Sequence, residues 1–260
     1  MVVICRRRAV VLAAIAVPLL AAALARPPAR AAMGQALAAG AGIGRRLPVY
    51  AVATAEPVMA LSFDAAWGAG RTPEILAILA GHDVRATFFL VGFWIDRYPE
   101  MVEKIVAAGH DLGNHSATHP RLDALGREAI AREIGTVHRQ LQRFEGGEPF
   151  LFRPPFGAYS DRVIEVAEEL GYLTIQWSLD SLDWRPTRPE RIVERVLDQA
   201  HPGAIVLFHN DGEHTPTALS PIISGLRARG YRLVPISELV YREDFRIDHR
   251  GFQHRRPTDR

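Results

Sequence analysis

The sequence predicts an α/β fold, and within that class an incomplete or distorted (β/α) barrel of about seven strands. From residue 58 onward, short apolar runs alternate with amphipathic helical segments, which is typical of a parallel sheet flanked by helices. Seven such runs are more than a small open sheet needs, although a doubly wound open sheet is the alternative on the same pattern. The expected strands are Val58–Phe63, Ala86–Val91, His110–Asn114, Phe150–Arg153, Tyr172–Leu179, Ala204–His209 and Tyr231–Pro235.

The segments between these strands carry the start and stop signals of helices. Thr72, Pro73 and Glu74 provide a cap, a proline at the first helical position and an acid in the first turn. Gly81 is then the expected end of this helix. The other expected helices cover 130–144, 160–171, 189–200 and 217–229.

The start of the chain carries a targeting signal. Arg6, Arg7 and Arg8 precede the 17-residue apolar run Ala9–Ala25. Such a run behind a basic flank predicts a signal peptide or N-terminal membrane anchor over residues 1–25, and a buried core helix is the alternative. We therefore expect an exported protein that is extracellular, in the cell wall or anchored on the outer face of the membrane.

The rest of the chain divides into a spacer, one domain and a tail. Residues 26–56 are rich in Ala, Gly, Pro and Arg and are expected to form a linker, 57–240 the folded domain, and 241–260 a charged disordered tail. A length of 260 residues suits one domain with short tails. A formal net charge of +2 does not suggest nucleic-acid binding, and a lone cysteine, Cys5, excludes an internal disulfide. A monomer is the default expectation.

Polar side chains lie at the ends of five of the expected strands, where β/α barrels place their active sites. Each has an ordinary alternative, such as a helix cap, a polar surface or a core histidine. A histidine pair four residues apart can bind one metal ion. Together, in this order and at these positions, they are hard to explain as packing. They are Asp64, His115 with His119, Arg153 with Phe156, Asp183 with Trp184, and His209.

Five segments around these residues resemble the five motifs of the polysaccharide deacetylases, carbohydrate esterase family 4, also called the NodB-homology domain. The resemblance covers roughly Pro57–Val240 and implies the distorted (β/α) barrel of that family. The segments are Ser62-Phe63-Asp64, His115-Ser116-Ala117-Thr118-His119, Arg153-Pro154-Pro155-Phe156-Gly157, Asp180-Ser181-Leu182-Asp183-Trp184 and Leu207-Phe208-His209.

The resemblance implies a divalent metal ion, most commonly zinc, held by His115 and His119. It also implies that Asp64 is the general base. The family's third metal ligand, a second aspartate, is replaced here by Ala65. Because catalytic zinc usually has three protein ligands, we expect this substitution to weaken metal binding.

The resemblance assigns the other motif residues to the remaining steps. His209 protonates the leaving amine, with Asp183 as the partner that favours its charged form. Arg153 orients Asp64 and keeps it ionised. A backbone N–H near Phe156 faces the oxyanion, and Trp184 forms a wall of the site beside His209.

The predicted function is removal of N-acetyl groups from cell-wall polysaccharide. The form Phe-Asp-x-x-Trp-Gly at Phe63–Gly68 resembles the sporulation-type (PdaB-like) branch of the family, which points to peptidoglycan. One alternative is a catalytically impaired glycan-binding wall protein, which Ala65 favours. Another is a barrel hydrolase acting on a small amide. Trp67 and Trp94 are candidates for stacking on sugar rings or for ordinary packing.

Overall fold

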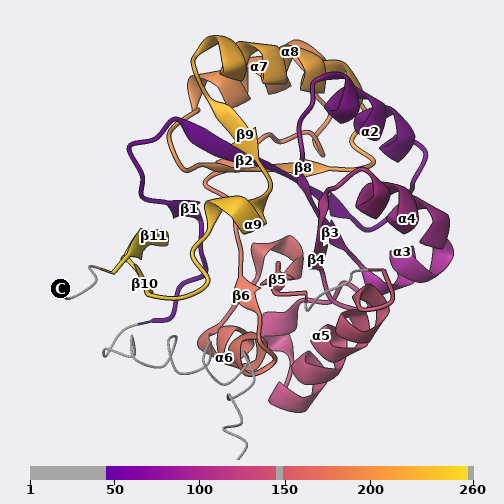
Figure 1. Cartoon of the computed structure of the whole chain (residues 1–260). Helices are drawn as coiled ribbons and strands as arrows, with labels where there is room; N and C mark the ends of the chain where they lie inside the picture. The colour runs from indigo at the N-terminus through magenta and orange to yellow at the C-terminus, as the bar shows by residue number, and fades with distance from the viewer. Residues whose placement is uncertain (1–44, 145–148, 257–260) are drawn as a thin grey trace, which may run out of the picture.

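The computed structural model describes residues 45–144 and 149–256, and its centre is a curled parallel sheet of eight strands (Figure 1). The strands follow the order β6-β5-β4-β3-β2-β8-β7, and β9 pairs with the beginning of β2. The predicted α/β barrel class is therefore confirmed. The strands are β2 (Val58–Ala65), β3 (Thr87–Leu90), β4 (Asp111–Asn114), β5 (Leu151–Phe152), β6 (Leu173–Thr174), β7 (Leu179–Asp180), β8 (Ile205–His209) and β9 (Arg232–Val234).

The helices surround the curled sheet on its outside (Figure 1). The five expected helices are present, and three helices that the sequence did not indicate (α3, α4 and α9) join them. The helices are α2 (Thr72–Gly81), α3 (Gly92–Arg97), α4 (Pro99–Ala107), α5 (Arg127–Leu141), α6 (Asp161–Glu169), α7 (Pro189–Asp198), α8 (Thr215–Ala228) and α9 (Ile236–Leu239), with 3-10 turns η1 (Leu122–Ala124) and η2 (Pro155–Gly157).

The strand order follows the chain around a ring and is interrupted between β6 and β7. On one side of β2 the strands run through β3, β4 and β5 to β6, while on the other β2 pairs with β8 and β8 pairs with β7. A first strand that pairs with a strand near the end of the chain belongs to a barrel and not to a doubly wound sheet. The expected fifth strand, Tyr172–Leu179, is thus two short strands at opposite ends of the sheet.

A segment before β2 fills this interruption. Val49 forms a parallel bridge with Ile175, in the crossing between β6 and β7. The N–H of Val49 donates to the carbonyl of Thr174 at 2.9 Å, and the N–H of Gln176 donates to the carbonyl of Val49 at 2.7 Å. Both groups would otherwise be open main-chain donors and acceptors at a sheet edge.

The expected linker and tail differ from the structure where it describes them. Three short strands form a second sheet with the order β1-β11-β10: β1 (Ala51–Val52), β10 (Phe245–Ile247) and β11 (Phe252–Arg255). The prediction of disorder is therefore wrong for 241–256. The sequence does not reveal this order because strands this short show no periodicity. The tail is also held by a contact that exists only in the folded chain, in which the side-chain amide of Gln253 binds both the N–H and the carbonyl of Tyr241.

The expected signal or anchor over residues 1–25 lies outside the described residues. In the part of the chain that the structure describes, no helix combines the length and the apolarity needed to cross a membrane.

The alternation of β2 separates an apolar face from a polar one. Phe63 stacks between Phe88 and Phe208, with ring centroids 4.9 and 5.5 Å away, in the layer beneath the helices. Ser62 and Asp64 point the other way because successive side chains of a strand alternate. Two polar groups therefore enter the interior of the barrel at the carboxyl end of its longest strand.

Substitution of Gly203 tests whether packing of the β1 segment contributes to the stability of the fold. Its φ of +75° is unfavourable for other residues, and an added Cβ would overlap the carbonyl of Val52. We expect Gly203→Ala to lower the free energy of unfolding by roughly 2–4 kcal/mol, measured by urea denaturation. Gly81→Ala is the control, since nothing lies within 4 Å of a Cβ there. Equal stability of the two variants would show that β1 adds little to the fold.

Candidate active site

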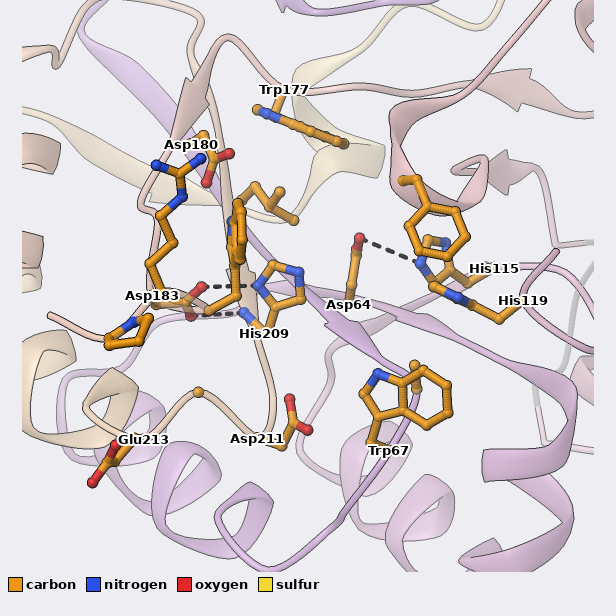
Figure 2. A pocket seen from close by; sticks show the side chains of 17 residues that line it. Asp64, Trp67, His115, His119, Trp177, Asp180, Asp183, His209, Asp211 and Glu213 are labelled. Atoms are coloured by element: carbon orange, nitrogen blue, oxygen red, sulfur yellow. Dashed lines mark hydrogen bonds and ion pairs between the residues drawn. The ribbon is translucent and has the colours of Figure 1, made fainter. Parts of the chain in front are cut away.

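A cleft of about 790 Å³ opens at the carboxyl ends of the strands (Figure 2). Almost all the residues singled out in the sequence line it, although they come from segments far apart in the chain. Arg153 and Trp94 do not line it, because both are fully buried. The lining includes Asp64, His115, His119, Phe156, Asp183, Trp184 and His209.

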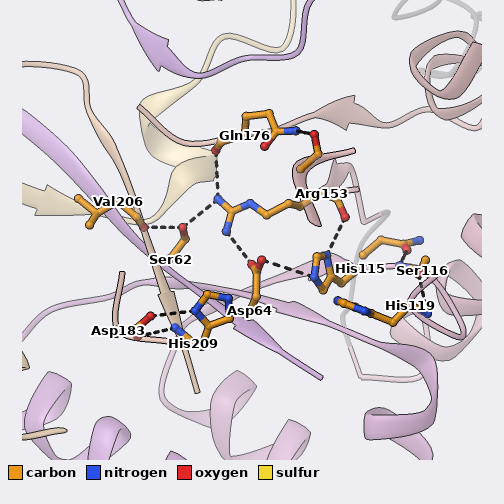
Figure 3. Close-up of polar contacts among 12 residues, drawn as sticks. Ser62, Asp64, His115, Ser116, His119, Arg153, Gln176, Asp183, Val206 and His209 are labelled. Carbon is orange, nitrogen blue, oxygen red and sulfur yellow. Dashed lines mark hydrogen bonds and ion pairs between the residues drawn. The ribbon is translucent and has the colours of Figure 1, made fainter. Parts of the chain in front are cut away.

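Arg153 connects the floor of the cleft to the barrel interior (Figure 3). Its Nη1 donates to Asp64 Oδ1 at 2.7 Å, and its Nη2 donates to Ser62 Oγ at 2.9 Å and to the carbonyl of Gln176 at 3.2 Å. The guanidinium also stacks on the ring of Phe89, 4.0 Å from its centroid. These contacts fix the guanidinium in one position.

Asp64 is held as a carboxylate by this arrangement. Its side chain is buried, and burial by itself would raise the pKa of the carboxyl group. The charge of Arg153 is the largest opposing effect; together with His115, His209 and the hydrogen bond from Arg153 it outweighs burial and keeps the pKa of Asp64 below its usual value. A carboxylate that stays ionised in an apolar site can accept a proton.

His115 presents one ring nitrogen to Asp64 and the other to the backbone. Its Nδ1 lies 2.7 Å from the carbonyl of Arg153, which accepts and therefore places the proton on Nδ1. The unprotonated Nε2 then faces Asp64 Oδ2 at 3.4 Å. A histidine whose second nitrogen donates to a carbonyl is the arrangement that proteins use to orient a metal-binding imidazole.

His119 reaches the same place through a tight turn. Ser116 and His119 both have positive φ, of 67° and 58°, and Ser116 Oγ accepts from the N–H of His119 at 3.1 Å. The two imidazoles lie 5.0 Å apart, centroid to centroid. Burial lowers the pKa of His115, and burial together with His115 lowers that of His119 to about 4. Both rings are therefore neutral at neutral pH, as metal ligands must be.

These two histidines fit a metal ion only in part. Among residues 45–144 and 149–256 there is no group of three His, Cys, Asp or Glu side chains arranged to hold one. Ala65, where the resemblance puts a third ligand, is fully buried in the apolar layer, while its neighbour Ala66 lines the cleft. Asp64 is the carboxylate closest to the imidazoles, and Arg153 already holds one of its oxygens.

His209 faces Asp64 from the end of β8 and has its own carboxylate. Asp183 Oδ1 lies 2.8 Å from the ring nitrogen Nδ1 of His209. Asp183 Oδ2 accepts from the backbone N–H of His209 at 2.8 Å and from Thr215 Oγ1 at 2.6 Å. Burial disfavours the charged ring. Its hydrogen bond to Asp183 and the negative charges of Asp183, Asp64 and Asp211 outweigh this, so the pKa of His209 lies above its ordinary value.

The loop after β5 forms the remaining wall. Phe156 adopts a positive φ of 61°, and its 63% exposed ring packs edge-on against His119 at 4.6 Å. Gln176 Nε2 donates to the carbonyl of Gly157 at 3.0 Å and so holds this turn. Trp184 lines the cleft directly after Asp183, 53% exposed, with the guanidinium of Arg185 over its ring at 4.7 Å.

Three supporting residues were not anticipated from the sequence. Ser62 receives a hydrogen bond from Arg153 and donates to the carbonyl of Val206 at 2.7 Å. Gln176 links Arg153 to the Phe156 turn, and Thr215 supports Asp183. Only Ser62 carries a local signal, since a serine inside an otherwise apolar strand needs a partner.

Residues 51–175 match the family model for polysaccharide deacetylase. A peptidoglycan-N-acetylglucosamine deacetylase of Bacillus cereus is 36% identical over 190 residues, which cover 71% of this chain and 89% of that protein. The chain belongs to the polysaccharide deacetylase family. An uncharacterized protein of Bacillus subtilis, YlxY, is 33% identical over 74% of this chain, but the match spans only 60% of YlxY.

Among solved structures, this member of the deacetylase family is similar to a pseudoenzyme of carbohydrate esterase family 4 from Bacillus anthracis. The TM-score is 0.72 at 33% identity, over 81% of this chain and 73% of that one. A mutant of that pseudoenzyme has restored enzymatic activity. Family membership is thus compatible with both active and inactive proteins, and the roles of individual residues in this chain remain predictions.

Removal of Arg153 tests how far Asp64 depends on it. In Arg153→Met the buried carboxylate loses its cation, so burial raises its folded-state pKa above the unfolded value. Stability is then lost as pH rises, because the unfolded state gives up its proton first. We expect a loss of about 3–5 kcal/mol at pH 8, measured by urea unfolding of the metal-free protein, and a smaller loss at pH 5.

The control for this change is Arg132→Met on the exposed face of α5, which should leave stability unchanged at both pH values. The double variant Asp64→Asn with Arg153→Met should remove most of the pH dependence. A loss of the same size at pH 5 and pH 8 would contradict the assignment of an ion pair.

Proposed function

We propose that this protein is a metal-dependent hydrolase that removes N-acetyl groups from cell-wall peptidoglycan. The observation that carries the proposal is the position of Asp64. Arg153 keeps Asp64 ionised through Oδ1. The other oxygen, Asp64 Oδ2, lies 3.4 Å from His115 Nε2 in a cleft that also holds His209. A base, an acid and two neutral imidazoles are the parts that metal-assisted amide hydrolysis needs.

In the proposed reaction the chain's own residues move two protons. Asp64 takes a proton from the attacking water as the new C–O bond forms. His209 gives its proton to the amine nitrogen as the C–N bond breaks, which leaves free amine and acetate. The backbone near Phe156 faces the developing oxyanion. A divalent ion held by His115 and His119 would supply Lewis-acid polarisation of the acetyl carbonyl and of the water.

Zinc is the proposed ion because imidazole ligands suit it. Peptidoglycan as the substrate is supported by the deacetylases of Bacillus to which the chain is similar. A role at the cell surface and in sporulation, with export or membrane anchoring through residues 1–25, is proposed from the sequence alone.

The test is a zinc titration of the purified full chain after chelation, with bound metal and released acetate both measured. Peptidoglycan and chitin oligomers are the substrates. We expect about one equivalent of zinc and acetate release that depends on it, while His115→Ala should reduce both. A folded chain that releases no acetate with zinc, cobalt or manganese would rule out the proposed activity.

The second candidate is a glycan-binding wall protein without activity. Ala65 and the similarity to a pseudoenzyme favour it specifically. The same assay separates the two functions through Ala65→Asp. Activity that arises only in this variant supports the binding protein, whereas activity in the wild type that rises further supports a weakened enzyme.

Asp183 gives a prediction about pH. Because its pKa is raised, His209 stays protonated at pH values at which an ordinary histidine would be neutral. Deprotonation of His209 should therefore set the alkaline limb of the pH profile of kcat/KM. Asp183→Asn removes the opposing charge, so the pKa of His209 falls and the limb moves to lower pH. We expect kcat to fall about 100-fold. An alkaline limb at the same pH in both proteins would exclude His209 as the acid.

A further inference from the structure

The large exposed hydrophobic side chains of the described residues gather at one place. They number four, all are aromatic, and three of them line the cleft. The fourth, Phe93, packs on Trp67 with ring centroids 5.7 Å apart and an interplanar angle of 36°. Exposed aromatic surface concentrated at one cleft marks a binding surface. The four residues are Trp67, Phe93, Phe156 and Trp184.

Trp67 and Trp94, which the sequence left as equal candidates, have opposite environments. Trp94 is fully buried, and its Nε1 donates to the carbonyl of Gly68 at 3.1 Å, so it is a packing residue. Trp67 is 62% exposed and lines the cleft. Its ring packs against Phe93 and also against His119, whose ring centroid is 5.7 Å away at an interplanar angle of 63°.

The loop that carries Trp67 is fixed before any ligand arrives. The carbonyl of Gly68 accepts from Trp94 Nε1 and also from Asn210 Nδ2, at 2.7 Å. Asn210 is buried, and its Nδ2 also donates to Thr72 Oγ1 at 3.0 Å. The main chain beside Trp67 is therefore tied to α3 and to the end of β8, so little conformational freedom remains to be lost on binding.

The Trp67–Phe93 pair and Trp184 lie at different sides of the reacting groups. Trp67 is on the side of His119, while Trp184 follows Asp183, the partner of His209 (Figure 2). A single sugar positioned over Asp64 would fill only the centre of this cleft. The exposed ring of Trp67, on the His119 side, would then be available to the next sugar of a chain.

We propose that Trp67, backed by Phe93, is a binding platform for a second pyranose ring next to the one that is deacetylated. This inference rests on the proposed function and assigns to it a residue that determines the preference for longer substrates. The apolar C–H face of a pyranose is flat enough to stack on an indole, and its hydroxyl groups stay in water at an exposed ring. A small amide would leave this platform unused.

The test measures binding separately from catalysis. Isothermal titration of the metal-free full chain with chitin oligomers of one to six sugars gives Kd as a function of length. In the wild type we expect Kd to fall once the oligomer is long enough to reach Trp67. Trp67→Ala should weaken binding of the hexamer about 10-fold and leave the monomer unchanged. Trp67→Phe keeps a flat ring and is the matched control, expected to bind within about 3-fold of the wild type.

Phe93→Ala should give a smaller loss for the hexamer, and it replaces the first variant if Trp67→Ala fails to fold. Equal hexamer affinity in Trp67→Ala and the wild type, or no binding of any oligomer by the wild type, would overturn the platform. Acetate release is measured in parallel with zinc present. A chain that binds by length but releases no acetate keeps the platform and loses the proposed activity, so the two failures are distinguishable.

Discussion

The buried guanidinium of Arg153 is the interaction on which the rest of the site depends. It lies inside the barrel with no exposed surface, and its donors reach β2 at Ser62 and Asp64 and the crossing between β6 and β7 at Gln176. Its own carbonyl accepts from His115. One residue therefore sets the ionisation of the carboxylate and the tautomer of the imidazole beside it. A buried cation of this kind needs an opposing charge, which Asp64 supplies at 2.7 Å.

The opposite side of the cleft has a hydrogen-bond network of its own. Asp183 receives two hydrogen bonds at one oxygen, from the His209 N–H and from Thr215, and its other oxygen faces His209 Nδ1. Neither group belongs to the Arg153 network. The site thus has two separately supported halves, one that keeps a carboxylate charged and one that favours a charged imidazolium. A group that takes a proton and a group that gives one need this difference in environment.

Much of this could be predicted because strand ends are visible in the sequence. Asp64 and His209 stand at the ends of apolar runs and His115 follows the strand-like segment His110–Asn114, and parallel strands bring such positions to one edge. The division of Tyr172–Leu179 into β6 and β7 could not be predicted, since the run is continuous and the break occurs where the distant Val49 segment pairs with the crossing. The roles of Gln176 and Thr215 depend on contacts between distant segments and have no local pattern. The helices α3 and α4 were missed because Pro99 separates two short segments that lack a long period.

The small sheet made by β1, β10 and β11 changes what counts as the functional unit of this chain. It joins the segment before β2 to the end of the described chain. Val49, just before β1, exchanges backbone hydrogen bonds with Thr174 and Gln176, and Val52 donates to the carbonyl of Gly203. A fragment trimmed to 57–240 would keep every residue of the cleft and lose the seam that holds Gln176 in place. Inactivity of such a fragment would reflect the loss of these backbone contacts and not a lack of catalytic residues. Boundaries drawn by similarity alone therefore cut through the unit that makes the site rigid.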